Sequence, residues 1–197
     1  MKSNFLALML ALIVTATAGA DVVYDEADDG DLSGDNLNPT MVTLSDASSN
    51  VNSKVIASTT FDPLDRDFFT ITIPDGYLLD QIMWGLYDTT EDQSFFAIAA
   101  GNTVPSTTNS SLLLGTALIG AGDVANDVLQ KLGEANLGGT GFTGPLGPGD
   151  YSFWFQENAA DVNYGMTFIL APDAVPEPAS ALLISTLGLA CVVRRRR

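Results

Sequence analysis

The sequence has no histidine and a single cysteine among its 197 residues, and it has few basic residues. Without histidine, the chain has no Ser-His-Asp or Cys-His catalytic site and no imidazole ligand for a metal. One cysteine excludes an internal disulfide and a thiolate zinc site. Eight lysines and arginines stand against 24 aspartates and glutamates, so the formal net charge is -16. This sign of charge opposes direct binding to nucleic acid or to an anionic membrane surface.

The first segment of the chain, residues 1–20, has the three parts of a secretory signal peptide. Lys2 supplies the positive start, residues 5–14 are ten consecutive apolar residues, and Ala18 and Ala20 form a small-residue cleavage site. The alternative is a buried N-terminal helix, which does not explain why these parts follow in this order. We therefore expect a signal helix that is removed on export.

A second apolar segment, residues 181–193, stands directly before the C-terminal arginines. As a helix, thirteen residues rise only ~20 Å, against a hydrocarbon core of ~30 Å. The segment predicts a short membrane helix, whereas an ordinary membrane anchor, the alternative, usually needs about 20 apolar residues. Cys191 lies in this segment as an apolar filler, with lipidation as the alternative. An arginine cluster favours the cytoplasmic side and places the rest of the chain outside the inner membrane. The predicted topology residues are Arg194, Arg195, Arg196 and Arg197.

Pro176, Glu177 and Pro178 stand just before this apolar segment. The two prolines disfavour helix, so this stretch is expected to be extended and open to a protease. The order of Pro-Glu-Pro, a short apolar span and terminal arginines resembles the PEP-CTERM sorting signal of Gram-negative bacteria, over residues 175–197. The resemblance implies recognition by an exosortase, a membrane transpeptidase-like enzyme that removes the tail. It also implies an inner-membrane intermediate, a final place at the cell surface or outside the cell, and a link to exopolysaccharide and biofilm.

Between the two ends, residues 21–174 are expected to form one ectodomain. It holds almost all of the acids but only Lys54, Arg66 and Lys131 as bases. Apolar residues recur mostly at period two, with turn residues between the runs, which predicts half-buried strands. One short helix is predicted from Asp123, as its cap, to Gly133. The fold class is therefore an all-β, antiparallel, jelly-roll-like sandwich. The expected strands are residues 22–24, 41–44, 54–57, 67–73, 77–87, 95–100, 112–119, 151–157 and 164–170.

Two stretches of the ectodomain resemble a known family. Residues 65–76 read D-R-D-F-F-T-I-T-I-P-D-G, and residues 148–153 read P-G-D-Y-S-F. Both are similar to the early and late strands of bacterial pre-peptidase C-terminal (PPC-like) domains. The resemblance implies a jelly-roll-like accessory module without catalytic residues. Some members of that family bind carbohydrate or protein matrices.

Acidic residues gather at two places that could hold calcium, an ion that takes several hard oxygen ligands. The first is an acidic run at residues 25–35, whose spacing does not fit an EF-hand; its alternative is a solvated, self-repelling segment. Its candidate ligands are Asp25, Asp28, Asp29, Asp31 and Asp35. The second is Asp62, Asp65 and Asp67, where turn chemistry is the alternative. Apart from calcium, no cofactor is expected.

Trp154 alternates with the aromatic residues of its predicted strand and could stack on a sugar ring if it is exposed. The alternative is a tryptophan covered by a loop or a second layer. The sequence has no G-x-S-x-G nucleophile motif and no phosphate-binding loop, and with so many carboxylates no catalytic pair stands out. We therefore expect a non-catalytic exported protein. The alternatives are a calcium-dependent carbohydrate-binding module and a secreted hydrolase.

Overall fold

A computed structural model of the chain describes residues 20–44, 52–60 and 65–173. The predicted signal helix up to Ala18, the Pro-Glu-Pro motif, the short membrane helix and the terminal arginines lie outside the described residues. Within the described ranges, no helix has the length and apolar character needed to cross a membrane.

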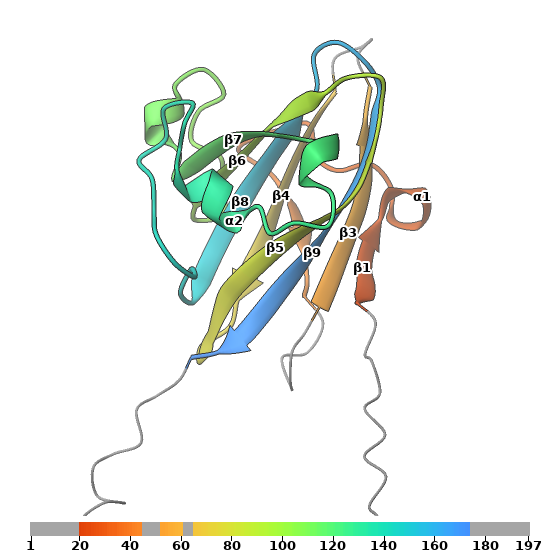
Figure 1. The fold of residues 1–197 in the computed structure, drawn as a ribbon. Helices are drawn as coiled ribbons and strands as arrows, with labels where there is room; N and C mark the ends of the chain where they lie inside the picture. Colours follow the sequence, from red (N-terminus) through yellow and green to blue (C-terminus); the bar gives the residue numbers. More distant parts are fainter. Residues whose placement is uncertain (1–19, 45–51, 61–64, 174–197) are drawn as a thin grey trace, which may run out of the picture.

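The described residues form nine strands and four short helical turns (Figure 1). The strands are β1 (Asp21–Asp25), β2 (Thr40–Val42), β3 (Asn52–Thr59), β4 (Arg66–Ile73), β5 (Tyr77–Asp88), β6 (Gln93–Ala100), β7 (Gly115–Gly120), β8 (Gly149–Gln156) and β9 (Val162–Pro172). The helical turns are α1 (Glu26–Asp29), η1 (Ser110–Leu112), η2 (Ala121–Asp123) and α2 (Leu129–Gly133).

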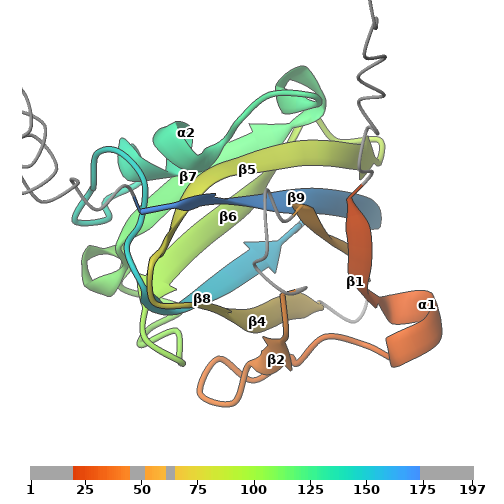
Figure 2. The same ribbon diagram turned by 90° about the horizontal axis from the view of Figure 1, so that it is seen from below.

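The strands make two sheets that face each other, which confirms the predicted all-β sandwich (Figure 2). One sheet has the order β1-β3-β9-β5 and the other has the order β2-β4-β8-β6-β7. Most neighbours are antiparallel, but β1 pairs with β3 and β2 pairs with β4 in parallel. The predicted antiparallel sandwich is thus observed among the long strands, and the two parallel pairings, which were not predicted, lie at the edges, where the chain adds short strands from its first 25 described residues.

The main core lies between the sheets and is built from the period-two faces of the long strands. Phe69, Ile71 and Ile73 of β4 face inward with at most 1% of their surface exposed. The facing sheet contributes Trp84 of β5 and Tyr164 of β9, whose rings stack with centroids 5.9 Å apart. Close packing of so many rings gives the domain a hydrophobic core without a disulfide in its sequence.

The predicted single helix is shorter than expected and begins later. Asp123 ends η2, and Ala125 has a positive φ of 65°, which breaks any helical run. The helix α2 begins at Leu129, with Leu129 and Leu132 fully buried against the core. A second short α-helix, α1, follows β1 directly inside the acidic run, where no helix was expected.

Both ends of the described domain lie at one end of the sandwich (Figure 1). The register aligns Asp21 of β1 with Ser53 of β3, and Ser53 with Phe168 near the end of β9. From Pro172 back to Tyr164, β9 rises roughly 25 Å at strand geometry. The residues around Tyr164 and the end of β1 therefore lie well away from the point where the chain leaves β9.

Candidate metal centre

Three carboxylates meet at the side of the sandwich where the chain passes from one sheet to the other. Figure 2 shows α1 on this side, between β1 of one sheet and the segment that leads to β2 of the other. Glu26 begins α1, Asp31 follows it, and Asp67 lies in β4. One carboxylate oxygen from each residue lies within 4.8 Å of the others. We call Glu26, Asp31 and Asp67 the carboxylate cluster.

Asp67 lies in the core because of its strand position. It is two residues before Phe69, so it takes the inward phase of β4 and its side chain has no exposed surface. Its Oδ2 accepts a hydrogen bond of 2.7 Å from the hydroxyl of Tyr164, which belongs to the opposite sheet. Its Oδ1 is buried and has no hydrogen-bond partner. A buried carboxylate with one free oxygen is an unusual and costly element of a core.

Glu26 is held in place by backbone and hydroxyl donors. Its Oε1 accepts from the N–H of Leu32 at 3.1 Å, and its Oε2 accepts from the N–H and Oγ of Ser58 at 2.6 and 3.0 Å. These bonds tie the segment after α1 and strand β3 to one half-buried carboxylate. The Tyr24 hydroxyl closes the same loop by donating to the carbonyl of Gly30 at 2.7 Å. The sequence places Glu26 among its acidic neighbours, and only the fold shows that it points inward.

Burial and crowding raise the pKa values of this region. Desolvation is the main reason that the pKa of Asp67 rises to about 9, and the charges of Glu26, Asp65 and Asp31 add to it, while the Tyr164 hydrogen bond opposes it. Desolvation also raises the pKa of Glu26 against the hydrogen bonds from Leu32 and Ser58. Without a cation, Asp67 therefore carries a proton at neutral pH. The cluster can hold either protons or a positive ion in the same space.

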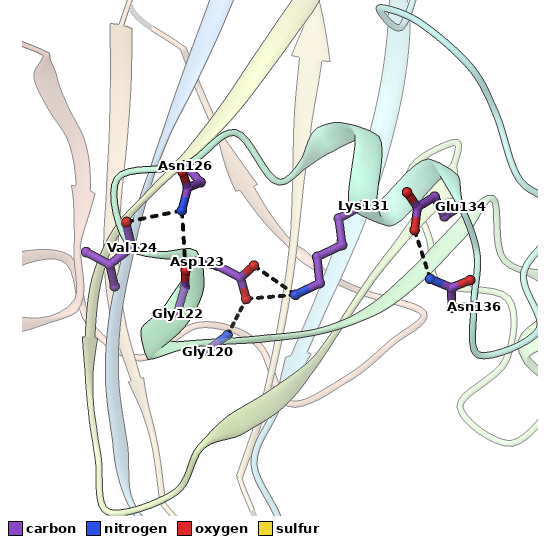
Figure 3. Close-up of polar contacts among 8 residues, drawn as sticks. All are labelled: Gly120, Gly122, Asp123, Val124, Asn126, Lys131, Glu134 and Asn136. Carbon is purple, nitrogen blue, oxygen red and sulfur yellow. Dashed lines mark hydrogen bonds and ion pairs between the residues drawn. The ribbon is translucent and has the colours of Figure 1, made fainter.

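No ion pair joins a described basic side chain to Glu26, Asp31 or Asp67. Arg66 precedes Asp67 in β4, and its Nε is buried without a hydrogen-bond partner. Lys131 is engaged elsewhere, with both oxygens of Asp123 at 2.8 Å (Figure 3). A cavity of about 380 Å³ borders Glu26 and Ser58 on the side of Asn163, and its lining includes neither Asp31 nor Asp67.

Of the five aspartates predicted as calcium ligands in the acidic run, the structure brings only Asp31 into the cluster. Three of the others stabilise local turns. The Asp25 carboxylate accepts from the N–H of Ala27, and that of Asp29 accepts from the N–H of Asp25. Asp35 accepts from the N–H of Leu37 and from the side chain of Asn38, and the Asn38 bond is the main reason that its pKa is lowered. Asp28 is exposed on α1.

Of the second predicted calcium group, only Asp67 belongs to the carboxylate cluster. The cluster therefore combines Asp31 from the first predicted group and Asp67 from the second with Glu26, which neither group included. Asp62 lies outside the described residues. Asp65 is half-buried, and burial raises its pKa, with the charge of Asp31 adding to the effect. The signal that could have found the site is the period-two phase of Asp67, which matches that of the core residues of β4.

Trp154 is a core residue rather than an exposed platform. Only 7% of its surface is exposed, and its ring packs edge-on to Phe95 at 4.6 Å and tilted to Phe68 at 5.8 Å. Val104 and Leu113, from the segment between β6 and β7, complete this second hydrophobic cluster on the outer face of the sheet. The covered tryptophan that the sequence left as an alternative is the arrangement observed, and the ring is not placed to stack on a sugar.

Comparison with solved structures finds a likeness to PliG of Aeromonas hydrophila, a periplasmic inhibitor of g-type lysozyme. The sequences are 14% identical, with a TM-score of 0.41, over 67% of this chain and 96% of PliG. A likeness at this level carries no argument about function. Comparison with curated proteins gives no match, and the PPC-like relationship stays a prediction.

The family comparison concerns the C-terminal tail. A model of the PEP-CTERM protein-sorting motif matches residues 174–197, which begin directly after the last described residue, Asp173. The predicted sorting signal is thereby confirmed, and the chain carries at its C-terminus the motif of proteins that are exported and sorted by an exosortase.

Proposed function

We propose that this chain is a non-catalytic exported protein whose β-sandwich is released at the cell surface or into the extracellular matrix after an exosortase removes its tail. The observation that carries the proposal is the match of residues 174–197 to the PEP-CTERM motif. In this proposal, Pro176, Glu177 and Pro178 are the sorting motif, and the four terminal arginines hold the tail on the cytoplasmic side.

The architecture supports this role. The described domain ends at the same end of the sandwich at which it begins, so a membrane-held tail would leave the rest of the sandwich projecting outward (Figure 1). The densely packed aromatic core suits a domain that must stay folded outside the cell without disulfides. The high negative charge keeps such domains apart in solution. The link to exopolysaccharide and biofilm, which the sorting family implies, stays a prediction.

The geometry of the carboxylates favours a non-catalytic protein over the hydrolase alternative. A glycoside hydrolase, the hydrolase class that works with carboxyl groups alone, needs two of them that both reach the substrate. Asp67, the most strongly shifted carboxyl of the described residues, has no exposed surface, and its nearest donor is the core residue Tyr164. The carbohydrate-binding alternative relied on Trp154 as an exposed ring on which a sugar could stack. Because Trp154 is buried, this support for it is removed.

The test is the mass of the protein recovered from outside the cell, in a host with an exosortase and in the same host without one. We expect the wild-type chain to lose its N-terminal segment in both hosts and its C-terminal tail only where the exosortase is present. Glu177→Gln should keep the tail, because it changes the one charged residue of the motif. Glu134→Gln, which makes the same chemical change at an exposed site of the sandwich, should be processed normally. A full-length chain that stays in the cytosol would overturn the proposal.

A further inference from the structure

The starting point is an unpartnered oxygen in the core. Asp67 is completely buried, its Oδ2 is occupied by Tyr164, and its Oδ1 has no hydrogen-bond donor. Buried polar groups in proteins almost always have a partner, which is a protein group, an ordered water or an ion. The carboxylate of Asp67 lies within 4.8 Å of carboxylate oxygens of Glu26 and Asp31. A fully buried carboxylate with an unpartnered oxygen therefore belongs to the same cluster as two further carboxylates.

The chemistry of that space favours a hard cation. All three side chains offer carboxylate oxygens, and no described basic side chain is paired with them. Calcium accepts such ligands at about 2.3–2.6 Å, so two oxygens on opposite sides of the ion are about 5 Å apart. Magnesium demands a near-ideal octahedron and usually keeps several of its waters, whereas calcium takes six to eight oxygen ligands in a flexible geometry. Three carboxylates from separate segments of the chain therefore suit the more tolerant ion.

We propose that Glu26, Asp31 and Asp67 bind one calcium ion, with water completing its coordination. Such an ion would join three parts of the chain: the start of α1, the segment after it, and β4. Because α1 follows β1 of one sheet and Asp67 lies in the other sheet, the ion would connect the two layers at this side of the sandwich. This inference does not depend on the proposed exosortase processing.

The position of each ligand indicates what it contributes. Glu26 is already oriented by Leu32 and Ser58, which together use three of its four lone pairs and leave one, on Oε1, for a metal. Asp67 is fixed by its strand and by Tyr164. Asp31 is exposed, so its carboxylate would meet the ion from the solvent side. A site with one solvent-exposed ligand fits the modest affinity of extracellular calcium modules, with Kd of about 10⁻⁴–10⁻³ M.

The experiment is calorimetric titration of CaCl₂ into the full chain, purified in detergent and stripped with a chelator, together with thermal unfolding in calcium or chelator. We expect heat of binding and a Tm that rises with calcium concentration. Asp31→Asn should weaken binding at least ~10-fold, because it removes one charged ligand. Asp28→Asn is the matched control: it makes the same change at an exposed residue of the same acidic run and should bind like the wild type.

Each outcome decides for or against the site. The absence of heat and of a Tm shift up to ~10 mM CaCl₂, well above the affinity of extracellular calcium modules, would overturn the proposal. Binding that Asp28→Asn weakens as much as Asp31→Asn would place the ion diffusely on the acidic run and also overturn it. Equal heat and Tm shift from MgCl₂ would overturn the choice of calcium. Glu26→Gln provides a second variant: loss of binding there, with an unchanged Tm in chelator, would support the site.

Discussion

At the residue scale, the distinctive feature of this domain is an ionisable side chain in a core position. Asp67 occupies the same face of β4 as Phe69 and Ile71, and the sequence shows this phase. What the sequence does not show is the partner across the sandwich, because Tyr164 lies 97 residues away in the other sheet. The strand pattern could therefore predict that Asp67 points inward, but only the packing of the two sheets shows what it meets there.

The burial of Asp67 predicts how stability depends on pH in chelator. Its pKa is about 9 in the folded chain and near its ordinary value when unfolded, so between about pH 4 and 9 the folded state holds the extra proton. The raised pKa values of Glu26 and Asp65 act in the same direction. The free energy of unfolding should therefore fall as pH rises through this window, with a slope approaching ~1.4 kcal/mol per pH unit for one proton.

Urea unfolding between pH 5 and 8, in chelator, measures that slope. Asp67→Asn should flatten most of it, because the amide cannot titrate, while Asp28→Asn should leave it unchanged. A wild-type protein that becomes more stable as pH rises over this range would show that Asp67 is ionised in the folded state, contrary to the prediction.

At the element scale, the segment between β7 and α2 shows where local pattern and tertiary structure disagree. The apolar spacing after Asp123 predicts a helix, yet residues 124–128 run beside β5 instead. The backbone N–H of Trp84 donates to the carbonyl of Asn126, and the backbone N–H of Val128 donates to the carbonyl of Ile82. Backbone pairing with an edge strand satisfies these groups as well as a helix would, and it covers the edge. The spacing of apolar residues along the sequence does not show that pairing with β5 competes with helix formation here.

The other long strands largely follow their sequence patterns, but β7 begins at Gly115 rather than at Leu112, which ends the 3-10 turn η1, and the register of β5 shifts. Tyr164, Met166, Phe168 and Leu170 share the buried face of β9 as alternation predicts. In β5, Ile82 and Trp84 are buried, but Leu86 is 37% exposed, because the register with β9 shifts between Trp84 and Leu86. A β-bulge changes which face the following residues occupy, and nothing in the apolar pattern marks its position. The long strands were thus predictable, while the bulge and the parallel edge pairings were not.

Asp127, rather than the predicted Asp123, links the start of α2 to the sheet. Its Oδ1 accepts from the N–H groups of both Leu129 and Ile82 at 3.0 Å. Asp127→Ala should therefore lower the free energy of unfolding by about 1–2 kcal/mol, because it leaves two backbone donors without this partner. Lys131→Ala removes the partly exposed ion pair of Figure 3 and should cost no more than ~1 kcal/mol. Urea denaturation midpoints compare the two, and an equal or larger loss in Lys131→Ala would contradict the prediction.

At the scale of the whole molecule, the packing of apolar side chains in the core stabilises the fold, whereas repulsion among the negative charges at the surface destabilises it. The core holds rings from both sheets, such as Trp84 stacked on Tyr164 and Phe69 stacked on Phe153. The domain holds almost all of the 24 acids of the chain but only three of its eight bases, so its surface is strongly negative, which favours solubility but disfavours the compact state. The amino-acid composition alone predicts this balance. The number and packing of the aromatic contacts depend on long-range strand pairing, which composition does not encode.

Screening of that charge predicts how stability responds to ordinary salt. At low ionic strength the like charges of the folded domain repel over a Debye length of ~30 Å, which shrinks to a few ångströms in strong salt. Raising NaCl from ~10 mM to ~500 mM in chelator should therefore raise the Tm by a few degrees. The rise should be the same in wild type and in Asp31→Asn, because screening acts on the whole surface and a calcium site acts through its ligands. A Tm that falls with NaCl would contradict this prediction. It would mean that attractive pairs such as Lys131 with Asp123 outweigh the repulsion among the negative charges, so that the charged surface stabilises the fold.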